Sequence, residues 1–202
     1  MTDETPEPNG AAPNGAGTAP DGAGTAPELV EGEWTGENAV EEVVGDLLRE
    51  REETVAAAES LTGGLIGSRI TDVPGSSDYF DRSLVTYAYD AKRQELSVPR
   101  EDLDAHGAVS APVARAMAQG VRDRADTTWG VSATGIAGPG GGRKDKPVGL
   151  VYVGVAFAAP WGTNESYTRA RRFELDGNRA TVKAKSATCA LAELVGAIRE
   201  HE

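Results

Sequence analysis

A serine followed by a threonine and two glycines is the first group of residues that could do chemistry. The stretch Glu59-Ser60-Leu61-Thr62-Gly63-Gly64 joins a short apolar run, 55–58, to the start of an apolar helical pattern. Free backbone N–H groups at the start of a helix bind anions, so a serine there could act as a nucleophile beside an oxyanion hole. Alternatively, Ser60 or Thr62 only caps the helix. Spacing alone leaves both interpretations open.

Lys92 is the second candidate, because lysine is rare in this chain. Only five of the 20 basic residues are lysines, and Lys92 stands where a predicted strand, which includes Tyr87, passes into a helix. A lysine acts as a general base only if burial or a nearby cation lowers its pKa. The alternative is a solvated lysine on a helix surface, and the sequence leaves both open.

A glycine-rich loop is the third candidate. The segment Thr134-Gly135-Ile136-Ala137-Gly138-Pro139-Gly140-Gly141 follows an apolar strand pattern. Glycines at the end of a strand allow the backbone to approach a ligand such as a phosphate or a ring. We therefore favour a ligand-binding loop over a tight structural turn.

The scarcity of histidine and cysteine narrows the chemistry. His106 and His201 are the only histidines, and Cys189 is the only cysteine. We expect His201 to lie at a frayed C-terminus, His106 to lie in a turn before a capped helix, and Cys189 to be a small apolar residue in a helix. A Ser-His-Asp triad, a metal site and a disulfide are therefore not expected. If the chain is a hydrolase, a Ser–Lys arrangement is the economical choice.

The elements that must position these residues alternate between helix and strand, which predicts an α/β sandwich. Two adjacent strands late in the chain, 150–158 and 165–174, predict that the sheet is mixed. Asn38 and Ser110 are the expected N-caps of two of the helices. The other expected helices cover 65–73, 91–96 and 180–199, and the other expected strands cover 55–58, 83–87 and 129–136.

Composition separates a tail from a domain. Residues 1–35 are rich in Gly, Pro and Ala and nearly repeat Gly15-Ala16-Gly17-Thr18-Ala19-Pro20 seven residues later. Such a segment buries too little apolar surface to offset its ordering entropy, so we expect a disordered tail before a single domain over 36–202.

The net charge of -12 indicates which binding partners and which solution conditions suit the protein. It argues against a nucleic-acid partner, because phosphate binding needs clustered basic residues. Many carboxylates and few lysines suggest an acidic, halophile-like surface, a hypothesis that fails if transfer from molar KCl to dilute buffer leaves stability unchanged. No apolar stretch suits a membrane span, and we expect a cytoplasmic protein.

Seven motifs, in this order, resemble the CinA C-terminal domain family over roughly residues 38–200. Each motif alone is weak, but the seven in register are specific. They are Ala58-Glu59-Ser60-Leu61-Thr62-Gly63-Gly64, Pro74-Gly75-Ser76-Ser77, Val85-Thr86-Tyr87 with Ala91-Lys92, His106-Gly107-Ala108-Val109-Ser110, Thr134-Gly135-Ile136-Ala137-Gly138-Pro139, Lys146-Pro147-Val148-Gly149, and Arg172-Phe173 before Gly177-Asn178-Arg179.

The resemblance implies a three-layer α/β/α sandwich with a mixed, mostly parallel sheet. It also implies a cofactor-free amidase that hydrolyses nicotinamide mononucleotide to nicotinic acid mononucleotide and ammonia, in pyridine-nucleotide recycling toward NAD. A homodimer is also expected. Ser60 would be the nucleophile and Lys92 its base, with Tyr87 orienting or relaying the proton. The substrate-binding residues would be Glu59, Thr62, Gly63, Gly64, Thr134, Gly135, Ala137, Gly138 and Arg179.

The chain departs from the family pattern in two places. Leu61 stands where many members have Cys, and Tyr89-Asp90 replaces a small residue followed by Asn. The second departure keeps an alternative open, in which the domain binds a nucleotide or a partner, in competence or DNA damage, without turnover. Binding of nicotinamide mononucleotide without hydrolysis would favour that alternative.

Overall fold

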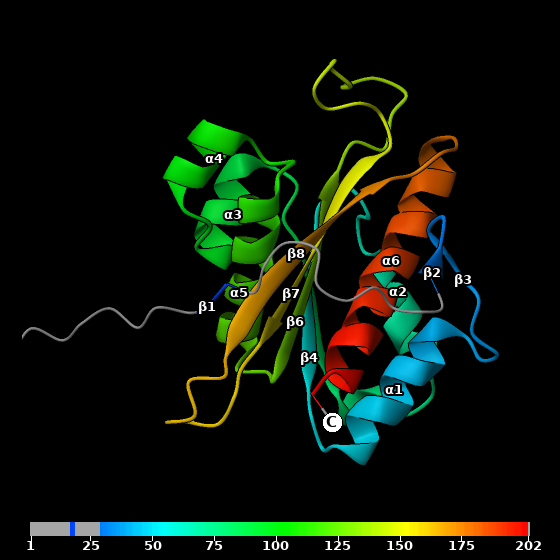
Figure 1. Cartoon of the computed structure of the whole chain (residues 1–202), viewed down its shortest axis with the longest axis vertical. Helices are drawn as coiled ribbons and strands as arrows, with labels where there is room; N and C mark the ends of the chain where they lie inside the picture. Colours follow the sequence, from blue (N-terminus) through cyan, green and yellow to red (C-terminus); the bar gives the residue numbers. More distant parts are fainter. Residues whose placement is uncertain (1–16, 19–28, 202) are drawn as a thin grey trace, which may run out of the picture.

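The computed structural model describes residues 17–18 and 29–201. A mixed sheet lies between two layers of helices (Figure 1). The long strands are β4 (Val55–Glu59), β5 (Phe80–Val85), β6 (Trp129–Gly135), β7 (Leu150–Phe157) and β8 (Tyr167–Glu174). The helices are α1 (Val40–Glu50), α2 (Leu65–Thr71), α3 (Tyr89–Leu96), α4 (Arg100–His106), α5 (Ala111–Ala125) and α6 (Arg179–Arg199), with a 3-10 turn at Ser76–Asp78.

The strand order is β1-β8-β7-β6-β4-β5, where β1 is the two-residue strand Gly17–Thr18. Strand β4 pairs in parallel with both β5 and β6, whereas β7 is antiparallel to β6 and β8. Four of the five long strands therefore run in one direction. The mixed, mostly parallel sheet and the antiparallel β7–β8 pair are confirmed.

The two faces of the sheet are covered by different helices, as Figure 1 shows. Helices α1, α2 and α6 pack on one face, where the larger apolar cluster joins Leu48, Ile70, Trp129 and Leu194. Helix α5 lies on the other face with α3 and α4, and Met117 and Val121 pack there against Ala56 of β4. The three-layer α/β/α prediction is confirmed.

Gly120 allows α5 to lie directly against the end of α3. A β-carbon at Gly120 would lie 1.9 Å from the carbonyl oxygen of Leu96, the last residue of α3. Such an approach is sterically forbidden to any residue with a side chain. The absence of a side chain at position 120 therefore helps to fix α3, the helix that carries Lys92.

Several local predictions were wrong. Ala39, not Asn38, is the N-cap of α1, and the Asn38 carbonyl instead accepts a 2.8 Å hydrogen bond from the Trp34 indole. Ser110 is the N-cap residue of α5, as predicted, although its hydroxyl donates to the Gly107 carbonyl instead of accepting a helical N–H. His106 belongs to α4, a helix that the sequence did not predict because Leu103 is its single buried residue.

The segment before α1 holds more structure than the tail prediction allowed. Strands β2 (Leu29–Val30) and β3 (Glu33–Trp34) form a hairpin, and Leu29 and Trp34 pack against the larger apolar cluster. Lys185 of α6 pairs with Glu33 at 3.3 Å. Order therefore begins before residue 36, while 1–16 and 19–28 of the predicted tail lie outside the described residues.

The C-terminal half of α6 is buried. Cys189 is fully buried there, as predicted, and burial raises the pKa of its thiol to about 12. His201 is not frayed, because its ring stacks on Tyr167 with 5.3 Å between centroids. No helix in the described part of the chain is long and apolar enough to cross a bilayer. The cytoplasmic location stays a prediction.

Candidate functional site

The turn after β4 is held by a buried carboxylate. Glu59 accepts backbone N–H hydrogen bonds from Gly64 and Ile66, at 2.7 and 3.1 Å, and a third from Gly67 at 2.9 Å. The Ser83 hydroxyl of β5 donates a fourth at 2.6 Å. A negative charge at a helix N-terminus is favourable, so Glu59 ties β4 to both α2 and β5.

This arrangement excludes the capping role that the sequence left open for Ser60 and Thr62. The N-cap of α2 is Gly64, in the left-handed conformation with φ 102°, and the first helical N–H groups go to Glu59. The Ser60 N–H donates to the Ala133 carbonyl of β6 at 3.0 Å. The turn is therefore fixed without the Ser60 hydroxyl, which stays available for chemistry.

Lys92 lies directly behind Ser60. Its ammonium nitrogen lies 3.0 Å from Ser60 Oγ, and the side chain is fully buried. Two backbone carbonyls, of Thr86 at 2.6 Å and Tyr87 at 3.1 Å, accept the other hydrogen bonds from Nζ. The predicted Ser60–Lys92 pair is thus in direct contact, and a solvated Lys92 is ruled out.

Burial changes the acidity of this lysine. Desolvation lowers the pKa of Lys92 from 10.5 to about 8. The hydrogen-bond partners of Nζ are a hydroxyl and two carbonyls, and no carboxylate lies among them. Because no counter-charge compensates the loss of water, the neutral amine becomes accessible near physiological pH.

Tyr87 contacts the Ser60–Lys92 pair through its main chain and not, as predicted, through its side chain. Its backbone carbonyl contacts Lys92, whereas the residue as a whole is 67% exposed and lines the cavity described below. Among the described residues the Tyr87 hydroxyl has no hydrogen-bond partner. Tyr87 therefore orients the Lys92 amine through its main chain, and its ring is left to meet a ligand.

A cavity of about 250 Å³ opens beside Ser60. It lies where β4, β5 and β6 end, because the carboxyl ends of parallel strands meet at one edge of the sheet. Its wall combines the Ser60 turn, Tyr87, the turn before α5 and the glycine-rich loop. The lining residues are Ser60, Leu61, Tyr87, Ala108, Val109, Thr134, Gly135, Ile136, Ala137, Gly138, Gly140, Gly141 and Arg179.

Seven predicted site residues line this cavity: Ser60, Tyr87, Thr134, Gly135, Ala137, Gly138 and Arg179. Arg179, the first residue of α6, is the single charged residue of the lining, and its guanidinium donates to the Gly138 carbonyl at 2.8 Å. That bond fixes the glycine-rich loop against α6. Gly138 needs to be glycine, since its φ is 75° and a β-carbon would lie 2.6 Å from Val148.

Besides Lys92, which lies behind Ser60, four predicted site residues lie outside the cavity: Glu59, Thr62, Gly63 and Gly64. Glu59 is saturated by its four hydrogen bonds and fully buried, which corrects the expectation of direct substrate contact. The Gly64 N–H is committed to Glu59, so it is not an oxyanion donor. Within the described turn, the N–H groups of Leu61, Thr62 and Gly63 have no protein partner and are the available donors.

Two residues that the sequence did not single out for the site hold the far wall of the cavity. Lys146 donates to the carbonyls of His106 and Val109, at 2.5 and 2.8 Å, and ties the end of the glycine-rich loop to the turn before α5. The Tyr89 hydroxyl accepts the Ala108 N–H at 3.1 Å. Tyr89 is one of the two departures from the family pattern, and here it braces a lining segment.

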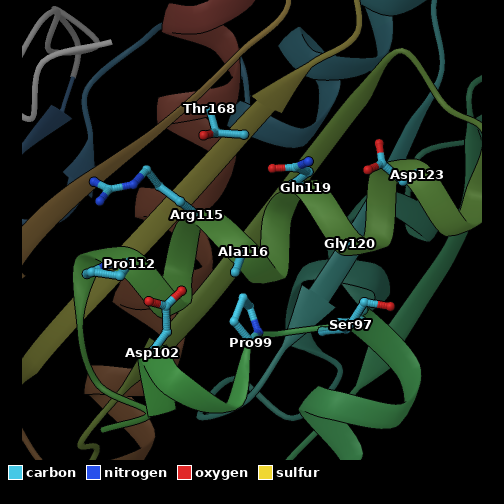
Figure 2. Close-up of a pocket in the computed structure, with 11 residues that line it drawn as sticks. Ser97, Pro99, Asp102, Pro112, Arg115, Ala116, Gln119, Gly120, Asp123 and Thr168 are labelled. Carbon is cyan, nitrogen blue, oxygen red and sulfur yellow. The ribbon is translucent and has the colours of Figure 1, made fainter. Parts of the chain in front are cut away.

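A larger cavity, about 470 Å³, lies elsewhere on the surface, between α5, the α3–α4 connection and β8 (Figure 2). Its charged lining residues are Asp102, Arg115 and Asp123, and Gly120 forms part of its floor. Its hydroxyls, Ser97 and Thr168, are not paired with a lysine or histidine. None of the predicted site residues lines it.

The fold and the site together define an α/β domain with a buried serine–lysine pair at the carboxyl edge of its sheet. Comparison with known proteins gives the family: the CinA C-terminal domain matches residues 37–198, and the chain belongs to that family. A CinA-like protein of Chlorobaculum tepidum is 50% identical over 168 residues, which are 83% of this chain and 39% of that protein. The chain spans about two fifths of the length of the curated relatives it matches.

A relative and two solved structures agree with this assignment. A CinA-like protein of Salinibacter ruber is 51% identical over 159 residues, which are 79% of this chain and 37% of that protein. The competence/damage inducible protein CihA of Agrobacterium tumefaciens matches with a TM-score of 0.72 and 35% identity, covering 79% of this chain and 95% of that one. The competence damage-inducible protein A of Klebsiella pneumoniae gives a TM-score of 0.73 and 28% identity, covering 82% of this chain and 100% of that one.

Proposed function

We propose that this chain is an amidase that hydrolyses the carboxamide of nicotinamide mononucleotide to nicotinic acid mononucleotide and ammonia. The observation that carries the proposal is the 3.0 Å contact between Ser60 Oγ and the buried amine of Lys92, beside a cavity. A hydroxyl next to a base of lowered pKa is the arrangement that an acyl-transfer enzyme needs. The choice of nicotinamide mononucleotide rests on the motifs shared with the family.

The hydrogen bonds of Lys92 fit a neutral amine that accepts a proton. A neutral amine has two N–H donors and one lone pair. The carbonyls of Thr86 and Tyr87 take both donors, so the lone pair is directed at the Ser60 hydroxyl. Once protonated, the ammonium has three donors for the same three acceptors. Both protonation states are therefore accommodated without rearrangement.

In the acylation step, Ser60 Oγ attacks the carboxamide carbon while its proton passes to Lys92 Nζ. A C–O bond forms, and the carbonyl oxygen becomes an oxyanion. When the tetrahedral intermediate collapses, the C–N bond breaks, and the leaving nitrogen takes the proton back from Lys92 and departs as ammonia. The acyl group remains on Ser60 as an ester.

In the deacylation step, Lys92 removes a proton from a water molecule that attacks the ester carbon. The second tetrahedral intermediate collapses with cleavage of the bond to Ser60 Oγ, and Lys92 returns the proton to the serine. The product is the carboxylic acid. The same base thus serves both halves of the reaction, as microscopic reversibility requires.

The oxyanion is assigned to the unpaired N–H groups of the Ser60 turn. Those of Leu61, Thr62 and Gly63 have no protein acceptor among the described residues, whereas that of Gly64 is occupied by Glu59. Preorganised N–H donors of this kind stabilise the developing charge without reorganisation. The Tyr87 ring and the glycine-rich backbone would contact the nicotinamide ring, and the predicted homodimer stays a proposal.

The test is to incubate the purified protein, in molar KCl, with nicotinamide mononucleotide and to follow ammonia and nicotinic acid mononucleotide. We expect product from the wild type and a loss of about 10³-fold or more in Ser60→Ala. Full activity in Ser60→Ala would overturn the nucleophile. Binding of the nucleotide by a folded wild type that makes no product would instead favour a binding module.

A further inference from the structure

The two ends of β8 differ in how they present the edge of the sheet. Along 169–174 the strand carries three arginines and a glutamate, and charged side chains on an edge strand oppose pairing with a further strand. Tyr167 and Thr168, at the start of β8, are uncharged. The two residues of β1 pair with them in parallel. An extended peptide segment therefore lies against the uncharged part of this edge.

The main chain of Thr168 is turned toward β1. In an antiparallel pair, successive residues direct their N–H and C=O groups alternately to the two sides. The Ala158 N–H donates to the Thr128 carbonyl on the β6 side at 2.8 Å, so Ala156 also directs its groups to β6. Its partner on β8, Thr168, is therefore not bonded to β7 and offers its N–H and C=O groups to β1. By the same alternation, the Arg169 amide bonds to β7.

The side chain of Thr168 lines the larger cavity, whose volume of about 470 Å³ has room for a ligand. Thr168 is 4% exposed, yet in the part of the chain that the structure describes its hydroxyl has no hydrogen-bond partner. The half-buried side chains of Gln119 and Asp102 line the same cavity and make no hydrogen bond or ion pair within the described ranges (Figure 2). Because a buried hydroxyl without a partner costs free energy, this cavity is suited to a ligand that supplies donors and acceptors.

The lining of the larger cavity fits the main chain of an extended peptide with small side chains. A hydroxyl, a carboxamide and a carboxylate together donate and accept hydrogen bonds, as the alternating N–H and C=O groups of a peptide require. Ala116 and Gly120 of α5 add little bulk to the wall, so a backbone can approach this helix closely. Peptides that add a strand to a sheet are recognised by such main-chain bonds at the edge together with pockets beside it.

We propose that the β8 edge at Thr168 and the larger cavity form a docking site for an extended peptide, and that the segment Gly15–Pro20 of this chain is its occupant. The described part of that segment is β1. All six of its residues are uncharged and four are Gly or Ala, which matches the uncharged edge and the wall of α5. Docking there covers an edge that could otherwise pair with other chains. This inference is independent of the proposed function.

The near repeat of this segment, residues 22–27, is the natural competitor for the site. It ends just before β2, and Leu29 of β2 packs against the larger apolar cluster, on the face of the sheet that α6 covers. The larger cavity lies on the other face, beside α5. We therefore assign the site to the first copy, which is further from β2 along the chain.

The test introduces prolines into each copy, because proline has no N–H group and cannot continue a ladder. Three prolines at 17–19 alter the proposed occupant, and three at 24–26 make the same change in the near repeat as the matched control. Hydrogen exchange of single amides in the full chain is followed by NMR. The two variants are Gly17→Pro/Thr18→Pro/Ala19→Pro and Gly24→Pro/Thr25→Pro/Ala26→Pro.

We expect the Thr168 amide to exchange about tenfold or more faster in the first variant and within about twofold of the wild type in the control. The Arg169 amide should not change in either, which shows that the sheet stays folded. An unchanged Thr168 amide in the first variant would overturn the docking site, and equal acceleration in both variants would overturn the assignment to the first copy. A Thr168 amide that exchanges faster on dilution of the wild type would place the segment on a second molecule.

A free peptide of residues 14–21 tests whether the site recognises the segment itself. Added at about millimolar concentration to the first variant, it should shift the NMR signals of the Thr168 amide and the Gln119 carboxamide. The wild type, whose own segment competes, should need about tenfold more peptide for the same shift. The same peptide with the three prolines should shift neither signal. No shift at Thr168 would contradict docking at the edge, and a shift there without one at Gln119 would exclude the cavity from the site.

Discussion

Two buried ionisable groups lie in different regions of this molecule, and both have a pKa shifted toward neutrality. Lys92 lies at the carboxyl edge of the sheet, and burial lowers its pKa to about 8. Glu193 lies on α6 facing β8, is 3% exposed, and has its pKa raised to about 7 by burial, against the opposing pull of Arg171 and Arg169. The nearest of these cations, Arg171, lies 3.5 Å from its carboxylate.

The difference between the two groups lies in their partners. Lys92 is surrounded by neutral acceptors that suit the neutral amine, with its lone pair on a serine beside a cavity. Glu193 has cations nearby, yet its Oε1 lacks a hydrogen bond, and it contacts no cavity described above. A perturbed pKa alone is therefore a weak sign of function, and the geometry of the partners distinguishes the two.

The largest expected effect is that of replacing Lys92, which should lower activity but raise stability. Lys92→Met should reduce kcat/KM by about 10³-fold or more, because the proposed base is lost. The pKa of Lys92 is about 8 in the folded state and 10.5 in the unfolded state, so the lysine is charged in both states at pH 7. At that pH the folded state therefore bears the full free-energy cost of burying a charged amine. The variant should therefore be more stable by ~1–3 kcal/mol at pH 7. Urea unfolding and the amidase assay measure the two, and a strong loss of stability would make Lys92 structural.

The pH dependence of kcat/KM is a second test of the role of Lys92. Because the proposed mechanism requires neutral Lys92, kcat/KM should rise about tenfold per pH unit below the pKa of about 8 and level off above it. Thermal unfolding recorded across the same range shows whether the protein stays folded. A flat profile from pH 6 to 9 would contradict a lysine base.

The smallest effect is expected at Glu193. Its folded pKa of about 7 lies above the unfolded 4.5, so the stability that protonation contributes is present below pH 4.5 and is lost as the pH rises through 7. Glu193→Gln resembles the protonated form. Its free energy of unfolding should therefore exceed that of the wild type by on the order of 1 kcal/mol between pH 5 and pH 8. Its activity should stay within about twofold of the wild-type activity. A variant that loses activity instead would link this region to the site.

Much of the fold and the central pair could be predicted from the sequence. Strands such as 150–158 have strong apolar patterns, and the rarity of lysine drew attention to Lys92. Helix α4 could not be predicted, since one buried residue in seven leaves no periodicity. Asn38 is not the cap because α1 begins one residue later than expected, with Ala39 at the N-cap. The Asn38 carbonyl accepts a hydrogen bond from the indole of Trp34, four residues earlier.

The role of each residue at the site was harder to predict than which residues lie there. Glu59 stands beside Ser60 in sequence, but alternation along β4 turns its carboxylate away from the cavity and toward α2 and Ser83. Lys146 acts on carbonyls 40 and 37 positions earlier, and such a long-range contact has no local signature. Contacts made by main-chain atoms, as at Tyr87, are likewise invisible in residue types.

The close approach at Gly120 limits how this protein can be redesigned. Gly120 forms part of the floor of the larger cavity, which would make it an inviting position for building a new ligand site (Figure 2). Yet any side chain there meets the Leu96 carbonyl, and Leu96 lies one turn after Lys92 on α3. A library that varies position 120 would thus move Lys92 relative to Ser60, so selecting variants for binding at the larger cavity would disturb the serine–lysine pair beside the smaller one.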